Sequence, residues 1–241
     1  MIFTDTGRRG ARALALFGRA HTLSTLVITC FAAGPVARGD PCDGPRVERD
    51  ANLESIRAFV EGRRMAVLTF SGYSGAEYED RAAMLTHAST VLDRHDPAKT
   101  VVSIGATAQG IGAVYELAKQ KGFTTLGIVS TLARDEHVPL SPSVDHVFFI
   151  ADDAWGGLEP GTDRLGPTSA AIVDLGAEFV AIGGGEVTRD EMLAARRAGK
   201  PVTFVPADMN HAIAREKARK RGEPAPTDFR GAAHGALASG D

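Results

Sequence analysis

Residues 101–112 read VVSIGATAQGIG and continue into AVYELAK at residues 113–119. The apolar start has the length of a buried strand, the glycines predict a turn, and the apolar spacing that follows indicates a helix. Where a strand turns into a helix through glycines, the backbone can come close to an anion, because the first N–H groups of a helix are unpaired and its dipole is positive there. This stretch therefore predicts an α/β fold with an anion site at the turn.

A second stretch of the same kind lies nearer the C-terminus. Residues 179–188 read FVAIGGGEVT and continue into RDEMLAA at residues 189–195. A single glycine-rich turn has a simpler interpretation, because glycine also lets a helix pack closely on a strand. Two such turns in one domain predict a site for a phosphorylated ligand.

Apolar runs of strand length alternate with helical spacing along most of the chain. We expect strands at 65–70, 100–104, 124–129, 145–150, 178–182 and 201–205, and helices at 51–62, 76–94, 110–121, 167–175, 188–198 and 207–221. Nearly unbroken apolar strands between helices are covered on both faces, which predicts one α/β domain with a mostly parallel sheet and helices on both sides. Right-handed crossovers then place every strand's carboxyl end, and both glycine-rich turns, at one edge.

Composition limits the classes of partner. The chain of 241 residues is 44% hydrophobic and 24% charged, with a net charge of −3. A nucleic-acid binder usually carries a basic patch, so we expect no nucleic-acid partner, and we interpret the basic run at 215–221 as a solvated helix face. The two cysteines, Cys30 and Cys42, have no zinc-ligand spacing, and we predict no metal site.

The two ends of the chain differ from its middle. Residues 1–38 place arginines before an apolar run at 23–33 and then small residues, which resembles a signal peptide; a disordered segment or a misassigned start codon are the alternatives. A signal peptide implies an exported or periplasmic protein, and the alternatives imply a cytoplasmic one. We expect a linker and a short helix at 39–62, the α/β domain at 63–221 and a flexible tail at 222–241.

Three segments together carry a resemblance to a known superfamily. They are FSGYSG at 70–75, IGATAQGIG at 104–112 and IGGGEVTRDE at 182–191. Over residues 64–210 the chain resembles the Rossmann-like nucleotide-binding domains that include the Lonely Guy cytokinin-activating phosphoribohydrolases, often labelled lysine decarboxylase-like, and the DNA-processing protein A domain. The last segment is similar to their motif Pro-Gly-Gly-x-Gly-Thr-x-x-Glu. The resemblance implies a Rossmann-like fold, a small-molecule nucleotide ligand and a homo-oligomer.

The chain also departs from that motif. Ile182 replaces the proline, and Thr188 and Glu191 match only if one residue is inserted. The phosphoribohydrolases carry an arginine on the preceding helix, where this chain has GPTS at 166–169 and Arg164 lies several residues earlier. Cleavage of an N-glycosidic bond needs a carboxylate and a cation for the phosphate, so the resemblance favours nucleotide binding over catalysis. A phosphoribohydrolase or related N-glycosidase, and a non-catalytic interaction module, remain the alternatives.

These arguments define the candidate site. The candidate ligand-binding residues are Ser71, Gly72, Ser74, Gly75, Gly105, Thr107, Gly110, Ile111, Gly112, Gly183, Gly184, Gly185 and Thr188, and the candidate catalytic carboxylates are Glu191 and Glu186. We expect a phosphate on the N–H groups of residues 110–112 and 183–185, and a ribose or base over residues 71–75 and Trp155.

Some candidate residues have a purely structural interpretation as well. Thr188 can cap a helix, with Glu191 three residues later completing a capping box. Trp155 can stack on a base or anchor its loop, and His211 can be an acid–base group or part of a polar helix start. Pyridoxal phosphate would need a Schiff-base lysine, but lysines such as Lys119 lie on or just after expected helices; we predict neither this cofactor nor lysine decarboxylation.

Overall fold

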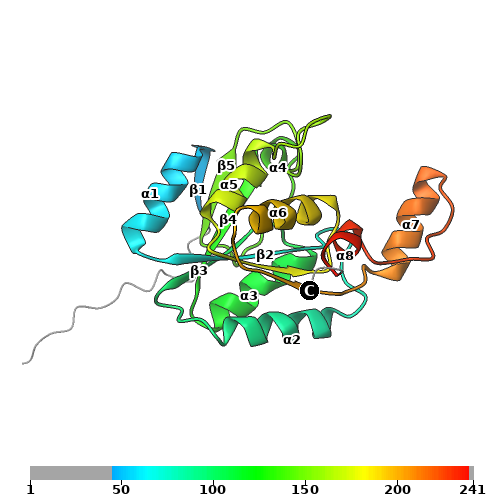
Figure 1. Cartoon of the computed structure of the whole chain (residues 1–241), viewed down its shortest axis with the longest axis horizontal. Helices are drawn as coiled ribbons and strands as arrows, with labels where there is room; N and C mark the ends of the chain where they lie inside the picture. Colours follow the sequence, from blue (N-terminus) through cyan, green and yellow to red (C-terminus); the bar gives the residue numbers. More distant parts are fainter. Residues whose placement is uncertain (1–44, 239–241) are drawn as a thin grey trace, which may run out of the picture. The chain divides into compact units, whose positions relative to one another are not determined.

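The computed structural model describes residues 45–238. The segment expected to be a signal peptide and both cysteines lie outside the described residues. A seven-stranded sheet with strand order β1-β5-β4-β3-β2-β6-β7 forms the centre of the domain, and every pair of neighbouring strands is parallel (Figure 1). The predicted Rossmann-like α/β fold is confirmed.

The helices and strands follow the expected alternation. The strands are β1 (Arg46–Ala51), β2 (Ala66–Gly72), β3 (Thr100–Ile104), β4 (Thr124–Ser130), β5 (His146–Ile150), β6 (Glu178–Ile182) and β7 (Val202–Val205). The helices are α1 (Leu53–Arg63), α2 (Arg81–Leu92), α3 (Ala113–Gln120), α4 (Leu132–Asp135), α5 (Pro167–Leu175), α6 (Glu186–Arg197), α7 (His211–Arg221) and α8 (Ala232–Leu237), with a 3-10 turn at Gly110–Gly112 before α3.

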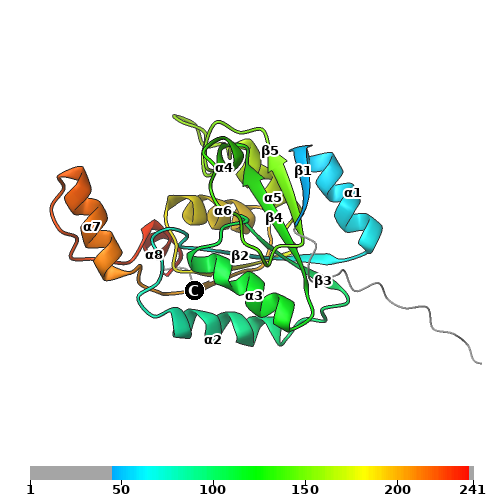
Figure 2. The ribbon, with the colours of Figure 1, turned by 180° about the vertical axis from the view of Figure 1, so that it is seen from behind.

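The two faces of the sheet bury two separate cores. Because side chains alternate along a strand, Leu68 and Phe70 of β2 pack towards α2 and α3, whereas Val67 packs towards α1, α5 and α6. Figures 1 and 2 show α2 and α3 together on one face and α5 and α6 on the other. Apolar residues are needed at nearly every strand position, which explains the continuous apolar runs.

The strand order reverses beside β2. From β2 the chain adds β3, β4 and β5 on one side of that strand, and β6 and β7 on the other. Open parallel sheets bind ligands outside the carboxyl ends of the strands at such a switch point. The fold therefore predicts a ligand site between the loops that follow β2, β3, β4 and β6.

Three parts of the fold differ from the sequence prediction, and the shortest is helix α4, which lies where no helix was expected. Strand β1 lies within the segment expected to be a linker and pairs with β5 at the sheet edge. Five of its six residues are exposed, so it has no apolar run to mark it. Helix α8 lies within the segment expected to be a flexible tail, yet Ala233 and Leu237 are buried with the α6 side of the core. Small residues allow this close packing, although their composition is also typical of loose tails.

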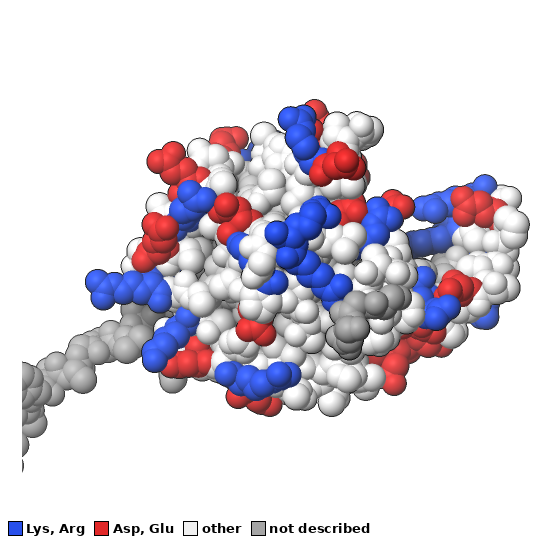
Figure 3. Space-filling view, viewed as in Figure 1, with Lys and Arg blue, Asp and Glu red and all other residues white. Residues whose placement is uncertain are grey.

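Charged side chains are mixed on the surface rather than gathered by sign. Figure 3 shows basic and acidic residues interspersed on one face. In α7, Glu216 lies 2.7 Å from Arg219 and 3.6 Å from Lys220, and only Ala218 of the helix is buried. This agrees with the interpretation of 215–221 as a solvated helix face. Within residues 45–238, no helix combines the length and apolar character that crossing a bilayer requires.

Candidate functional site

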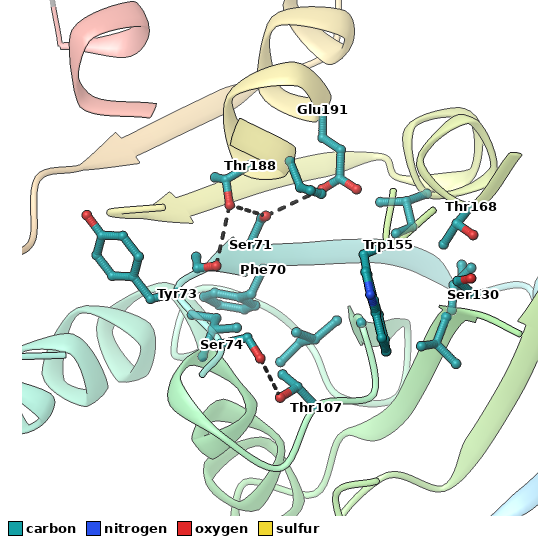
Figure 4. A pocket seen from close by; sticks show the side chains of 18 of the residues that line it. Phe70, Ser71, Tyr73, Ser74, Thr107, Ser130, Trp155, Thr168, Thr188 and Glu191 are labelled. Carbon is teal, nitrogen blue, oxygen red and sulfur yellow. Dashed lines mark hydrogen bonds between the residues drawn. The ribbon is translucent and has the colours of Figure 1, made fainter. Parts of the chain in front are cut away.

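A cavity of about 440 Å³ lies at the carboxyl edge of the sheet, next to the switch point. Its walls come from the ends of β2, β3 and β4, from the loops that contain Leu140 and Trp155, and from the first turns of α5 and α6 (Figure 4). Many of the residues predicted for the site line it: Ser71, Gly72, Ser74, Gly105, Thr107, Ile111, Gly185, Glu186, Thr188 and Glu191. Both glycine-rich turns thus contribute to one cavity.

Two glycines of the first turn, Gly110 and Gly112, serve packing instead. A Cβ atom at Gly110, where φ is +56°, would lie 2.1 Å from the Tyr73 carbonyl oxygen, and one at Gly112 would lie 2.0 Å from the Thr107 carbonyl oxygen. The N–H of Ile111 donates to Tyr73 O at 2.7 Å, and the N–H of Gly112 donates to Gln109 O at 3.0 Å. These two amides are engaged within the protein and do not point to a ligand, unlike the expectation for residues 110–112.

Two glycines of the second turn also pack against the protein and do not reach the cavity. The N–H of Gly183 donates to Val205 O at 2.8 Å, and a Cβ atom there would lie 2.5 Å from the Tyr73 ring. A Cβ atom at Gly184 would lie 2.5 Å from the Thr188 side chain. Neither glycine lines the cavity, and neither does Gly75, whose carbonyl accepts a hydrogen bond from Lys217 at 2.8 Å.

Gly185 is the glycine of this turn that opens onto the cavity. It is the N-cap of α6, with no side chain capping the helix, and a Cβ atom there would meet nothing within 4 Å. The helix starts two residues earlier than predicted, so the expected capping box is wrong: Thr188 and Glu191 both lie inside the helix. Because Gly185, Glu186 and Val187 line the cavity, the positive end of α6 faces it.

Glu191 is buried in the wall of the cavity, with 3% of its surface exposed. The Ser169 hydroxyl donates to Glu191 Oε1 at 2.7 Å, and Ser71 Oγ lies 3.4 Å from Oε2 and 3.0 Å from Thr188 Oγ1 (Figure 4). Burial raises the pKa of Glu191 to about 7, and the hydrogen bonds from Ser169 and Ser71 oppose part of that rise. This carboxyl group can therefore hold or release a proton near neutral pH. Glu186, by contrast, is exposed.

Hydroxyl groups that the sequence prediction missed complete the wall. Thr69, Ser103, Ser130 and Thr168 line the cavity, and Thr69 is the register neighbour of Ser103 on the adjacent strand. Within residues 45–238, the buried hydroxyl oxygens of Thr69 and Thr168 have no hydrogen-bond partner. The signal was present in the sequence, because Thr69 and Ser71 alternate with apolar residues at the end of a buried strand.

The cavity wall has no cationic side chain. Among its described lining residues there is no Lys, Arg or His. Arg164 is 77% exposed at its side chain and pairs with Glu159 at 2.6 Å, away from the cavity. His211 lies elsewhere too, 3.3 Å from Asp208 and stacked on Phe229, as the polar helix-start interpretation predicts. No group of three His, Cys, Asp or Glu residues within 45–238 is placed to hold a metal ion.

Comparison with known proteins finds similarity at the level of the fold. No family model and no curated protein matches the chain. Similar solved structures include the structural-genomics target TM1055, which is 20% identical with a TM-score of 0.41 over 57% of this chain and 72% of that chain. The Moco carrier protein from Chlamydomonas reinhardtii is also 20% identical, with a TM-score of 0.41 over 59% of this chain and 76% of that chain. DNA processing protein A from Streptococcus pneumoniae is another, at 14% identity and a TM-score of 0.39 over 74% of this chain and 63% of that chain.

Proposed function

We propose that the protein binds a small nucleotide in the cavity at the carboxyl edge. The observation that carries the proposal is the open N-terminus of α6 at Gly185, which faces a cavity of about 440 Å³. That volume lies within the usual range of small-molecule sites, roughly 300–1,000 Å³. The proposal keeps the predicted phosphorylated ligand and, of the N–H groups expected at 110–112 and 183–185, retains those at the end of the second turn, at Gly185 and the start of α6.

The phosphate would lie against the first turn of α6. The N–H groups there have no acceptor inside a helix, and the helix dipole favours an anion. Ser74 and Thr107 line another part of the same cavity, with their hydroxyl oxygens 2.8 Å apart. Because no lysine or arginine lines the cavity, we expect binding in the micromolar range or weaker.

The test is calorimetry of the purified chain with AMP and ADP-ribose, with Gly185→Asp as the key variant. The new carboxylate would cap α6 itself, since Asp is a strong N-cap and the position is open, and it would repel a phosphate. We expect at least tenfold weaker binding with unchanged or slightly higher thermal stability. Gly185→Asn, which caps without charge, should weaken binding less. No binding to the unaltered chain, or equal binding by Gly185→Asp, would overturn the proposal.

A second candidate function is cleavage of the N-glycosidic bond of the bound nucleotide. Glu191 favours it, because a buried carboxyl group with a pKa of about 7 can protonate a leaving base or activate water. The cavity wall has no cation to hold the phosphate, so binding remains the leading function. The assay is release of free base from AMP, which should disappear in Glu191→Gln while AMP still binds. If the unaltered chain releases no base from the common nucleoside monophosphates, this candidate fails and the binding function stands.

A further inference from the structure

Two buried hydroxyl groups in the cavity wall have no partner. Thr69 and Thr168 are 2% and 3% exposed, and within the described chain neither Oγ1 atom makes a hydrogen bond. Burial of a hydroxyl without a hydrogen bond lowers stability, so most buried hydroxyls in folded proteins are paired. Valine has nearly the shape of threonine and would avoid this loss. Both residues line the cavity, and because their Oγ1 atoms are themselves covered, a ligand supplies the missing partner when the side chains turn towards it.

These hydroxyls belong to one region of the cavity, which we call the inner compartment. Its wall is formed by Thr69, Ser103, Ile128, Ser130, Thr168 and Ile172. The strand residues among them lie in the middle of β2 and in the carboxyl halves of β3 and β4, and the other two lie on α5. None carries a charge. The compartment therefore combines an apolar surface from the isoleucines with uncharged hydroxyls that can donate or accept hydrogen bonds.

Trp155 stands at the entrance of the inner compartment. In Figure 4 its indole lies between Ser71 on one side and the pair Ser130 and Thr168 on the other. Although it lines the cavity, the side chain is 48% exposed. A large aromatic surface that remains open at a cavity offers a flat platform for another ring.

The loop that carries Trp155 is fixed on both sides of it. Before the tryptophan, the N–H of Ala154 donates to Asp152 Oδ1 at 2.9 Å. After it, the N–H of Gly157 donates to Ser169 Oγ at 2.8 Å, and the N–H of Leu158 donates to Asp190 Oδ2 at 3.2 Å. The same Ser169 hydroxyl donates to Glu191. The backbone on both sides of Trp155 is thus tied to the wall of the cavity, which favours a preformed loop at the binding surface.

We propose that the inner compartment holds the heterocyclic base of the nucleotide, stacked on Trp155, with its polar edge hydrogen-bonded to the hydroxyls of Thr69 and Thr168. This inference rests on the proposed function and adds the part of the ligand that decides specificity. The compartment is uncharged, so it suits a neutral ring and leaves the phosphate at the start of α6. Stacking on an aromatic side chain tolerates any base, whereas the hydroxyls favour a base whose edge carries N–H and ring nitrogen or carbonyl groups.

Trp155 gives a direct measurement, because the chain contains one tryptophan. The full chain is titrated with AMP, UMP and ribose 5-phosphate while tryptophan emission is followed, and calorimetry measures the same affinities. We expect at least one of the two nucleotides to change the emission, and ribose 5-phosphate to bind without changing it. The variants Thr69→Val and Thr168→Val should bind that nucleotide about tenfold more weakly, the usual effect of one lost hydrogen bond, and bind ribose 5-phosphate as before.

Stability measurements separate this role from a structural one. Because the two hydroxyls are unpartnered, both valine variants should keep or raise the thermal unfolding midpoint, and Thr203→Val at an exposed position of β7 is the control for both measurements. The inference is overturned if the nucleotide binds without changing the emission, or if both variants bind the nucleotide as tightly as the unaltered chain does. It is also overturned if the variants lose as much affinity for ribose 5-phosphate as for the nucleotide. If neither the nucleotides nor ribose 5-phosphate bind the unaltered chain, the proposed function itself is overturned, and this inference with it.

Discussion

At the scale of single residues, Glu191 links the stability of the protein to pH. Its pKa rises from the ordinary 4.5 to about 7 because the group is buried. The folded state then binds a proton more tightly than the unfolded state, so this contribution to stability is complete below about pH 4.5 and is lost as pH rises through 7. Each unit of pKa difference corresponds to about 1.4 kcal/mol.

We therefore expect Glu191→Gln to be more stable than the unaltered chain at pH 8, by on the order of 2–3 kcal/mol, and to be close to it at pH 4.5. Glutamine keeps an oxygen that can accept from Ser169 and lacks a charge to bury. Urea unfolding of both proteins at the two pH values measures the difference. An equal difference at both pH values would contradict a raised pKa.

Glu186 also lines the cavity, but it is exposed to solvent. Its exposed carboxylate lies in the first turn of α6, beside the proposed phosphate position. We expect Glu186→Gln to bind AMP about two- to fivefold more tightly at low ionic strength, since a nearby like charge is removed, and the gain should shrink in high salt. Glu116→Gln in the first turn of α3, outside the cavity wall, is the matched control. An increase in AMP affinity that is the same at low and high salt would argue against a phosphate beside Glu186.

Single residues also show where sequence reasoning reaches its limit. It predicted that glycines after β3 and β6 lie at one edge, and Gly105 and Gly185 do line one cavity. It did not predict that Gly110 and Gly183 pack against Tyr73. A glycine that makes room for a ligand and one that makes room for a tyrosine look alike in sequence, because the difference lies in a residue far away along the chain.

At the scale of elements, Tyr115 joins the end of β3 to the neighbouring strand β4. Its hydroxyl lies 2.7 Å from Ile104 O on β3, 2.8 Å from Leu126 O on β4, and 3.1 Å from the backbone nitrogen of Ala106, which donates to it. The side chain is fully buried in α3's contact with the sheet. This tyrosine therefore holds the turn after β3, which contributes Gly105 and Thr107 to the cavity.

We expect Tyr115→Phe to lower the free energy of unfolding by about 2–3 kcal/mol, because it leaves buried carbonyl and N–H groups without their partner. Thr86→Val removes an exposed hydroxyl from α2 and should change stability by less than about 0.5 kcal/mol. Urea unfolding measures both variants. Equal stability of Tyr115→Phe and the unaltered chain would show that water or backbone groups replace the hydroxyl.

Some elements that bury much apolar surface were predicted with accurate bounds. The expected bounds of α5 and β6, 167–175 and 178–182, agree with the structure, because Pro167 starts the helix and a buried strand is apolar at almost every position. Strand β1 was missed because an edge strand has exposed residues on both faces. Helix α8 was missed because alanines and glycines carry no apolar period, although Ala233 packs fully.

At the scale of the whole domain, the C-terminal segment packs against the loops that follow β2 and β6 at the carboxyl edge of the sheet. The N–H of Gly231 donates to the Tyr73 hydroxyl at 2.7 Å, and the N–H of Ala233 donates to Gly184 O at 3.2 Å. Tyr73 in turn donates to Ala207 O at 3.1 Å. Segments after β2, β6 and β7 thus meet at α8, and Gly184 directly precedes the N-cap of α6.

Two glycines four residues apart, which is about one helical turn, test this closure: Gly231, at the N-cap of α8, and Gly235, inside it. A Cβ atom at Gly231 would lie 2.1 Å from Gly184 O, whereas one at Gly235 would meet nothing within 4 Å. Gly231→Ala should therefore lower the free energy of unfolding by about 1–3 kcal/mol and weaken AMP binding, because the strain falls on the backbone that positions Gly185. Gly235→Ala should raise stability by up to about 1 kcal/mol through helix propensity and leave binding unchanged. Urea unfolding and calorimetry of the two variants measure both effects, and a Gly231→Ala protein as stable as the unaltered chain would show that the C-terminal segment does not dock against the turn before α6.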